Sequence, residues 1–293
     1  MILFPNCKIN LGLNIVAKRS DGYHNIETIF LPIPLTDCLE LNPAHEDSFS
    51  IDGVELDCSA QDNLVVRVLN MLRAEDYDVP PVSIRLTKNI PSGAGLGGGS
   101  TDAAFMIKGL NELFHLGLTD EQMAAKVGRL GADCPVFIAN QPVYAEGKGE
   151  IFTELPVALV KKEFNVKCAD KEDTITLSIP SVLENYWLVL IKPNDFISTK
   201  EAYASVTPAP SKVSLKDIIT KPVKMWKGQM VNDFEKSVFP NHPVVSGICE
   251  QLYMLGATYA AMSGSGSTVY GLFRHEPILG DVFEDHFQWQ CKL

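Results

Sequence analysis

Residues 90–104, IPSGAGLGGGSTDAA, constrain the possible folds of this chain more than any other stretch. Five of the seven positions from 93 to 99 are glycine, and the stretch lies between a strand-like segment (82–90) and a helix-favouring run to about residue 114. Backbone amides of consecutive glycines can converge on an anion, and the start of a helix adds positive potential. We therefore expect a loop that binds a polyphosphate, against the alternative of a flexible linker or tight turn.

Three well-known motifs do not describe this loop. Gly93, Gly95 and Gly98 match the spacing G-x-G-x-x-G of dinucleotide-binding folds. The loop does not follow its strand directly, however, and Asp120, at about the right distance for the acidic partner, lies at a helix start. A Walker A motif would place a lysine after the last glycines, where Ser100 stands. The H-R-D and D-F-G motifs of protein kinases are absent from the sequence.

A strand with two different faces is expected near the N-terminus. The stretch KINLGLNIVAK, from Lys8, alternates apolar and polar residues. One face would carry Ile9, Leu11, Leu13 and Ile15, and the other Lys8, Asn10, Gly12 and Asn14. The polar face is the one suited to line a binding site.

The order of the remaining elements favours two mixed domains. Strand-like and helical segments follow one another without strict alternation, which indicates an α+β fold rather than a doubly wound parallel sheet. With 293 residues, of which 46% are hydrophobic, the chain is long enough for about two domains. We place them at 1–155 and 156–293.

Local signals predict three smaller features. Thr119 and Gln122 have the spacing of a capping box, which marks the start of a helix that ends near Gly131. Asp52-Gly53 indicates the turn of a hairpin within 49–56. The charged, weakly periodic segment 157–184 is interpreted as a hairpin or an insertion.

Charge and composition exclude several classes of partner. The formal net charge is −11, and no basic tract alternates with aromatic residues, so we expect no nucleic-acid partner. The longest apolar run, YWLVLI at 186–191, is too short to span a bilayer, and the N-terminus lacks a signal-peptide pattern. The seven cysteines are scattered without metal-ligand spacing, which predicts reduced thiols and no metal site. We therefore expect a cytoplasmic protein with no membrane partner.

The loop P-S-G-A-G-L-G-G-G-S-T (91–101) closely resembles the phosphate-binding loop of the GHMP kinases, the superfamily of galactokinase, homoserine kinase and mevalonate kinase. A-M-S-G-S-G-S-T (261–268) resembles the third glycine motif of the same superfamily. The resemblance implies a two-domain α+β fold with the active site in the cleft between the domains. It also implies a kinase that uses ATP as its Mg²⁺ complex.

Four further motifs resemble one branch of the superfamily. They are K-I-N-L-G-L (8–13), K-R-S-D-G-Y-H-N-I-E-T (18–28), G-A-D-C-P-V-F (131–137) and N-D-F-E (232–235). The resemblance implies phosphorylation of a hydroxyl of a small molecule that carries a cytidine diphosphate group, in non-mevalonate isoprenoid synthesis. The chain departs from this branch at Phe4-Pro5-Asn6-Cys7, where smaller residues are usual, and in the longer segment 157–184.

The resemblance implies that Asp133 is the base that receives the proton of the acceptor hydroxyl, with Lys8 as its charged neighbour. Phosphoryl transfer needs positioned phosphates, charge neutralisation and a proton acceptor, which these residue types supply. Two alternatives stay open. Asp133, before Cys-Pro, could instead be the N-cap of a helix, and Lys8 could protect an edge strand. The segment 232–235 is expected to be structural.

The resemblance also supplies the residues of two binding sites. For the nucleotide these are the loop, the helix start and two residues near the adenine: Pro91, Ser92, Gly93, Ala94, Gly95, Leu96, Gly97, Gly98, Gly99, Ser100, Thr101, Asn63 and Lys88. For the acceptor they are Asn10, Tyr23, His24, Thr199 and Tyr203, with the cytosine ring held between the two tyrosines. Ser100 and Thr101 could cap the helix or contact phosphate and Mg²⁺. A helix-start role for Asn63 and a solvated position for Lys88 are the open alternatives.

Two other functions remain compatible with the sequence. The first is a GHMP kinase for homoserine or a mevalonate derivative, for which Tyr23 and Tyr203 would have no use as a ring clamp. The second is a ligand-binding sensor that keeps the nucleotide site but has lost turnover. The presence of both Lys8 and Asp133 argues against the sensor.

Overall fold

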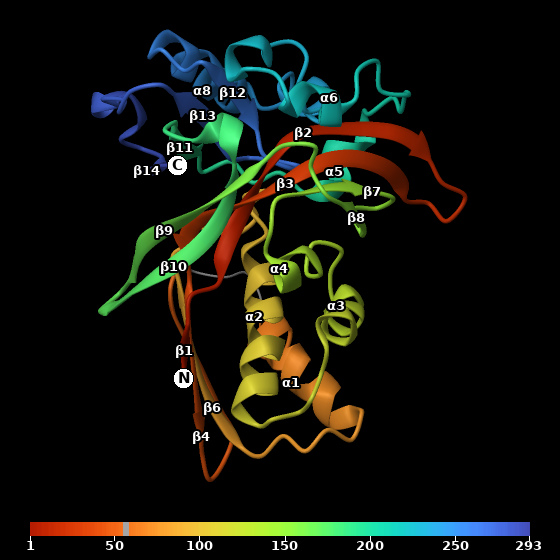
Figure 1. Ribbon diagram of the computed structural model, residues 1–293, viewed down its shortest axis with the longest axis vertical. Coiled ribbons are helices and arrows are strands. Elements are labelled where there is room, and N and C mark those ends of the chain that lie inside the picture. The colour runs from red at the N-terminus through yellow and green to blue at the C-terminus, as the bar shows by residue number, and fades with distance from the viewer. Residues whose placement is uncertain (55–58) are drawn as a thin grey trace.

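The computed structural model describes residues 1–54 and 59–293. Its lower half in Figure 1 is a four-stranded sheet with helices packed against it. In sheet order the strands are β1 (Ile2–Leu3), β4 (Cys38–Pro43), β6 (Val82–Lys88) and β5 (Ser48–Gly53), and β5 runs parallel to β6. The helices are α1 (Leu64–Ala74), α2 (Gly98–Leu113), α3 (Asp120–Gly128) and α4 (Val136–Ala139). Apolar side chains of this sheet and these helices form one core.

A second sheet crosses the middle of the molecule (Figure 1). It has the order β2-β3-β7-β8, with β2 (Asn6–Lys18), β3 (His24–Thr36), β7 (Val143–Glu146) and β8 (Ile151–Thr153). The two long strands β2 and β3 form its antiparallel centre. They lie between the helices of the lower half and the C-terminal elements above them, so side chains of β2 reach both halves.

The C-terminal part is built on a third sheet of antiparallel strands. Its order is β12 (Tyr259–Met262), β13 (Val269–Phe273), β11 (Trp187–Lys192) and β14 (Phe287–Lys292). Around it lie α5 (Thr199–Ala204), α6 (Leu215–Ile219), α7 (Glu235–Val238) and α8 (Pro243–Met254), with short 3₁₀ helices at Ser181–Leu183, Val223–Met225 and Gly280–Phe283. The described helices include none that is both long and apolar enough to cross a membrane.

The strand pair β2–β3 shares a core with the C-terminal part. Ile9 and Leu11 belong to the same buried cluster as Leu190, Trp226 and Tyr259. The boundary that we place near residue 155 falls between β8 and the next strand, and the buried cluster extends across it. Separation of the chain into 1–155 and 156–293 stays a proposal.

A bulge at Gly12 changes the two faces expected for β2. Leu11 pairs with Ile29 of β3, whereas Leu13 pairs with Thr28, and Gly12 has a φ of +69°. The extra residue in β2 reverses the side to which the following side chains point. Leu13 therefore does not share the face of Ile9 and Leu11 and lines a cavity instead, so the prediction of one continuous apolar face was wrong beyond residue 11.

The smaller predictions had mixed outcomes. The capping box is confirmed, because Thr119 and Gln122 exchange hydrogen bonds at the start of α3. The segment 157–184 contains a hairpin, β9 (Leu159–Cys168) and β10 (Lys171–Pro180), as one of its two interpretations expected. The prediction of a turn at Asp52-Gly53 was wrong, because both residues belong to β5 and pair with β6. The rest of that predicted hairpin, at 55 and 56, lies outside the described residues.

Candidate active site

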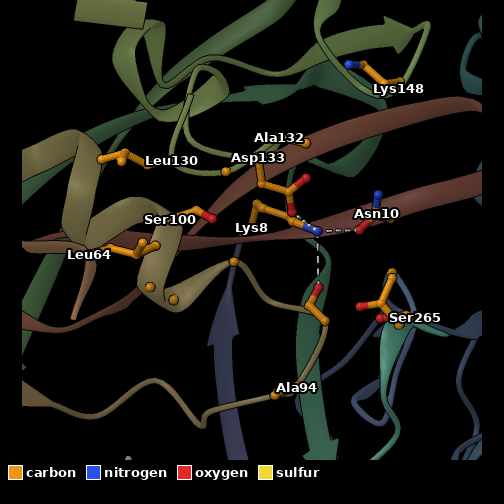
Figure 2. Close-up of a pocket in the computed structure, with 18 of the residues that line it drawn as sticks. Lys8, Asn10, Leu64, Ala94, Ser100, Leu130, Ala132, Asp133, Lys148 and Ser265 are labelled. Carbon is orange, nitrogen blue, oxygen red and sulfur yellow. Dashed lines mark hydrogen bonds and ion pairs between the residues drawn. The ribbon is translucent and has the colours of Figure 1, made fainter. Parts of the chain in front are cut away.

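A cavity of about 1600 Å³ lies where the N-terminal and C-terminal parts meet (Figure 2). Its walls include β2, the turn between β2 and β3, the start of α1, the glycine loop, the end of α3, the turn before α4 and the segment 196–203. Gly264 and Ser265, from the third glycine motif, close it from the C-terminal side. This arrangement agrees with the cleft expected from the sequence.

Lys8 and Asp133 form an ion pair in this cavity. Lys8 Nζ lies 3.3 Å from Asp133 Oδ2, and it also donates to Asn10 Oδ1 at 2.6 Å and to the carbonyl oxygen of Gly95 at 3.2 Å (Figure 2). Three partners match the three donors of an ammonium group. The Lys8 side chain is only 4% exposed, whereas that of Asp133 is 36% exposed. Lys8 is thus fixed in the wall of the cavity while Asp133 stays open to an incoming group.

Asp133 is not the N-cap of a helix. The helix that follows it, α4, has Pro135 at its N-cap position, and no side-chain cap is present there. Cys134 N donates to the carbonyl oxygen of Gly131, which closes a tight turn and leaves the Asp133 carboxylate directed at Lys8. The geometry therefore argues for the pairing with Lys8 and against the capping alternative.

The glycine loop adopts a conformation that only glycine tolerates without strain. Gly93, Gly95 and Gly97 have φ values of +58°, +72° and +74°, and α2 begins directly afterwards at Gly98. Positions with these left-handed φ values favour glycine, because glycine has no Cβ atom that could clash with the backbone. Most of the expected nucleotide residues line the cavity: Pro91, Ser92, Gly93, Ala94, Gly95, Gly97, Gly98, Gly99 and Ser100. The start of a long helix points into the cavity, as anion binding requires.

Two residues of the expected nucleotide set do not face the cavity. Leu96 belongs to the core beneath the loop, and Thr101 is fully buried with no hydrogen-bond partner for its hydroxyl group. Ser100, one residue earlier, lines the cavity. Of the two hydroxyl groups considered for phosphate or Mg²⁺, only that of Ser100 is in a position to reach them.

The third glycine motif is hydrogen-bonded to the glycine loop. Ser263 Oγ donates to the carbonyl oxygen of Gly95 at 3.0 Å, and accepts from Asn10 N at 3.2 Å. Asn232 Nδ2 donates to the carbonyl oxygens of Met262 and Gly264, both at 2.8 Å. The N-D-F-E segment therefore holds this motif in place, which is the structural role expected for it.

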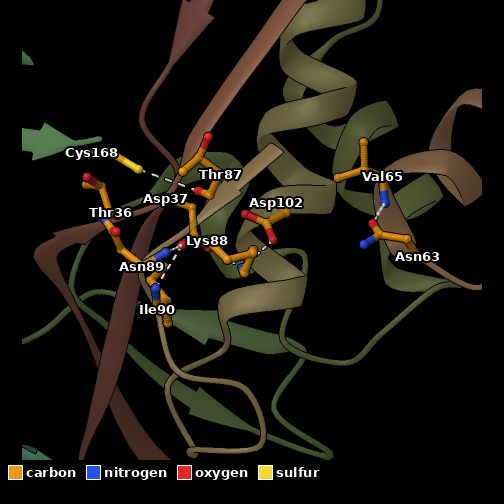
Figure 3. Close-up of polar contacts among 10 residues, drawn as sticks. All are labelled: Thr36, Asp37, Asn63, Val65, Thr87, Lys88, Asn89, Ile90, Asp102 and Cys168. Carbon is orange, nitrogen blue, oxygen red and sulfur yellow. Dashed lines mark hydrogen bonds and ion pairs between the residues drawn. The ribbon is translucent and has the colours of Figure 1, made fainter. Parts of the chain in front are cut away.

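Lys88 is buried rather than solvated (Figure 3). Its ammonium group is paired with Asp37 and, at 2.6 Å, with Asp102 of α2. Asp37 also accepts from the backbone amides of Asn89 and Ile90, so the cluster ties the end of β6 to the first turns of α2. Burial raises the pKa of Asp102, and the charge of Lys88 counteracts this shift. Lys88 borders the cavity, but its charge is already engaged by two carboxylates.

Asn63 caps α1 at the edge of the same cavity. Its side-chain oxygen accepts from Val65 N at 3.0 Å (Figure 3). This is the helix-start role that the sequence left open. Asn63 also lines the cavity, so contact with an adenine and the capping role are compatible.

The end of the cavity where the acceptor is expected to bind is rich in aromatic side chains. Tyr203 of α5 stacks on His24, with ring centroids 4.7 Å apart and planes at 17°, and meets Phe234 edge-on at 4.8 Å. Tyr23 is 61% exposed, and Lys148 Nζ lies 4.9 Å from the centroid of its ring. His24, and not Tyr23, therefore faces the ring of Tyr203, and no open space for a further ring lies between His24 and Tyr203.

The other acceptor residues have clear positions. Thr199 begins α5 and lines the cavity. Asn10 accepts from Lys8 and donates to Thr28 Oγ1 at 2.9 Å, which fixes its amide beside the ion pair. Burial, with the charge of Asp133 as a second cause, raises the pKa of Tyr203. The aromatic end of the cavity therefore lies near the proposed base.

Sequence reasoning missed several residues that line the cavity. Lys148 brings a positive charge to its mouth, and its position between two glycines in G-K-G was the available signal. Phe196, 70% exposed, lies over Gly93 of the loop and had no local signal. Cys7 and Cys134 are buried as expected, and burial raises the pKa of both thiols, that of Cys134 to about 11.

Comparison with known proteins agrees with this architecture. Residues 63–141 match the model of the GHMP kinases N terminal domain, and residues 219–284 match that of the GHMP kinases C terminal domain. The solved structure of a homoserine kinase from Cytophaga hutchinsonii superposes with a TM-score of 0.60 over 98% of this chain and 93% of its own, at 14% identity. Fold and site together define a small-molecule kinase of the GHMP type.

A narrower assignment follows from the more similar relatives. The 4-diphosphocytidyl-2-C-methyl-D-erythritol kinase of Parabacteroides distasonis is 47% identical over 100% of both chains. That of Bacteroides thetaiotaomicron is 47% identical over 96% of this chain and 95% of its own. A crystal structure of a 4-(cytidine 5'-diphospho)-2C-methyl-D-erythritol kinase, 28% identical, has a TM-score of 0.72 over 93% of this chain and 90% of that one. The chain belongs to the family of 4-diphosphocytidyl-2-C-methyl-D-erythritol kinases.

Proposed function

We propose that this chain transfers the γ-phosphoryl group of ATP to a hydroxyl group of 4-diphosphocytidyl-2-C-methyl-D-erythritol, in non-mevalonate isoprenoid synthesis. The family supports the reaction, and one observation supports the site: the pair of Lys8 and Asp133, 3.3 Å apart, lies beside a glycine loop at a helix start. The cavity holds room for both substrates. A cytoplasmic location is part of the proposal.

The proposed base is Asp133. Its partly exposed carboxylate is acceptor-only when ionised and can receive the proton of the acceptor hydroxyl as that oxygen attacks phosphorus. The 3.3 Å contact between Lys8 Nζ and Asp133 Oδ2 orients this carboxylate. The same ammonium group can turn from the Gly95 carbonyl oxygen toward the transferring phosphoryl group, whose negative charge is the stronger acceptor.

The nucleotide is proposed to lie along the loop and the start of α2. Amide groups from Gly93 to Ser100 and the positive end of α2 would face the phosphates. The adenine is proposed to lie near Asn63 and Lys88. Lys88 would contribute there indirectly, through the cluster that it forms with Asp37 and Asp102.

Mg²⁺ is proposed to arrive with ATP. Within the described residues no group of three or more histidine, cysteine, aspartate or glutamate side chains is arranged to hold a metal ion. This ion usually keeps several waters and is bound through substrate phosphates, with few protein ligands. The hydroxyl of Ser100 is the protein oxygen best placed for it, and the ion would supply charge neutralisation at the phosphates.

The acceptor is proposed to lie with its cytosine ring among Tyr23, His24 and Tyr203 and its reacting hydroxyl near Asp133. Thr199 and Asn10 would border the diphosphate and the sugar alcohol. Stacking of one base on an aromatic side chain contributes about 1–3 kcal/mol, which can offset a rotation of Tyr23 or His24. Because Tyr23 is exposed, it can rotate without loss of core packing.

A panel of acceptors tests this function. ATP consumption is measured with the cytidylated methylerythritol, with methylerythritol phosphate lacking cytidine, with homoserine and with mevalonate. We expect turnover with the first compound alone. Turnover with homoserine or mevalonate would instead assign another GHMP kinase activity, and ATP binding without turnover on any acceptor would favour a sensor.

A further inference from the structure

His242, the residue before α8, bridges two carboxylates, those of Asp195 and Glu201, which belong to a segment that lines the cavity. Its Nδ1 lies 3.2 Å from Asp195 Oδ2 and its Nε2 lies 2.8 Å from Glu201 Oε1. The His242 side chain is 15% exposed, and those of Asp195 and Glu201 are 39% and 45% exposed. Asp195 precedes α5 and Glu201 lies within it, so one ring connects both ends of a short segment to α8.

The geometry requires a charged imidazole. An ionised carboxylate only accepts hydrogen bonds, and a neutral imidazole has a single N–H donor. Both contacts are therefore satisfied together only when both ring nitrogens carry a proton. The hydrogen bond to Glu201, followed by that to Asp195, raises the pKa of His242 in agreement with this state. His242 acts as a cation that holds two anions.

The segment that His242 holds, 195–203, forms one wall of the cavity. Its cavity-lining residues are Phe196, Ile197, Ser198, Thr199, Lys200 and Tyr203. At one end, the Phe196 ring lies over Gly93 of the phosphate-binding loop, so close that a Cβ on Gly93 would be 2.7 Å from it. At the other end, Tyr203 stacks on His24. The segment thus extends from the loop to the aromatic end of the cavity.

Other contacts fix the segment at single points. Ser267 Oγ donates to the carbonyl oxygen of Asp195 at 2.7 Å, and Ser237 Oγ donates to that of Ala202 at 2.6 Å. Each of these anchors one backbone position. His242 differs because it joins the side chains of Asp195 and Glu201 to each other, and so sets the spacing between the two ends of the segment.

We propose that His242 is a positioning residue for the acceptor site. By binding Asp195 and Glu201 together, it holds the segment between them in one conformation. This conformation places both Phe196 and Tyr203 in the wall of the cavity. His242 itself does not line the cavity. The proposal extends the proposed function, since it assigns the aromatic end of the cavity to the cytidylated acceptor. Loss of the clamp weakens acceptor binding more than it slows the chemical step.

Steady-state kinetics of two variants at one position test this. His242→Gln keeps a planar polar side chain but has no charge, and we expect KM for the cytidylated acceptor to rise roughly three- to tenfold, from loss of one charge-assisted hydrogen bond. The turnover number and KM for ATP should stay within about twofold. In His242→Arg the arginine side chain is always charged and has several donors, so KM for the cytidylated acceptor should return close to its wild-type value. His275→Gln, on an exposed loop, is the matched control.

Hydrogen–deuterium exchange gives a readout that does not depend on the acceptor. In His242→Gln the amides of 195–204 should exchange faster than in the wild type, while those of α2 stay unchanged. An unaltered acceptor KM together with unaltered exchange would overturn the proposal. A parallel loss of turnover, of both KM values and of melting temperature would also overturn it, in favour of a general structural role. Failure of the wild type to use the cytidylated acceptor would refute the proposed function, and exchange would still decide the role of His242.

Discussion

Ser263 Oγ donates a 3.0 Å hydrogen bond to the carbonyl oxygen of Gly95, so two glycine motifs that are far apart in the sequence are in direct contact. A Cβ atom on Gly95 would lie 2.1 Å from the backbone oxygen of Ser263, and the φ of Gly95 is +72°. The phosphate-binding loop therefore owes its shape to the C-terminal part of the chain as well as to its own glycines.

Gly95→Ala should separate these two motifs. The left-handed backbone strain alone is about 1–3 kcal/mol, and the clash with Ser263 adds to it. We expect ATP affinity, measured by calorimetry, to fall about tenfold or more, since tenfold corresponds to about 1.4 kcal/mol. Gly247→Ala, in α8 with open space around its Cβ, is the control. Unchanged ATP affinity in Gly95→Ala would instead favour the alternative that the loop is a linker or tight turn and does not bind phosphate.

Tyr23→Ala tests recognition of the cytosine ring. Tyr23 is 61% exposed, so its removal should leave the melting temperature nearly unchanged. Loss of stacking should raise the acceptor KM by roughly tenfold to a hundredfold, with little change in the turnover number or in KM for ATP. Tyr23→Phe keeps the ring and serves as control. A normal acceptor KM in Tyr23→Ala would show that this ring does not bind the acceptor.

Lys88→Met tests the buried charge cluster. The side chains of Lys88, Asp37 and Asp102 are 2%, 0% and 3% exposed, so the substitution leaves two buried carboxylates without their cation. We expect the free energy of unfolding, from urea titration, to fall by roughly 3–5 kcal/mol. Arg85→Met breaks the exposed pair with Asp52 and should leave the free energy of unfolding nearly unchanged. Equal effects of the two variants would contradict a stabilising role for the cluster.

Glu235 predicts a pH dependence of stability. Burial raises its pKa to about 7 from an ordinary value of 4.5. Between these values the folded state binds more protons than the unfolded state, so the stabilising contribution is complete below about pH 4.5 and is lost as pH rises through 7. In Glu235→Gln, the decline in the free energy of unfolding between pH 4.5 and 7 should be shallower than in the wild type. The same slope in both proteins would show that Glu235 is not its source.

Local signals predicted the elements whose causes lie within a few residues. The capping box of α3 and the glycine loop before α2 both follow from short-range chemistry, and both were found in place. The face of Leu13 was missed because Gly12 can form a bulge or continue a strand, and only the pairing with β3 decides between them. Alternation alone carries no information about such an extra residue.

Apart from the pair of Lys8 and Asp133, which the family resemblance implied, contacts between distant segments were not predicted. A solvated position for Lys88 stayed open as an alternative to a place near the adenine, because nothing near Lys88 in the sequence shows that Asp37 and Asp102 surround it. His242 shows no pattern with Asp195 or Glu201, which lie more than forty residues away. For Asp133 the sequence allowed two roles, helix N-cap or base. The structure argues against the first, because α4 has Pro135 at its N-cap position.

The turnover number of Asp133→Asn with the cytidylated acceptor tests the central claim most directly. Asparagine keeps the size of the side chain but cannot accept the hydroxyl proton at neutral pH. We predict a fall in the turnover number of about 10²-fold or more, with ATP affinity nearly unchanged. Turnover at the wild-type rate would contradict the assignment of Asp133 as the base opposite Lys8.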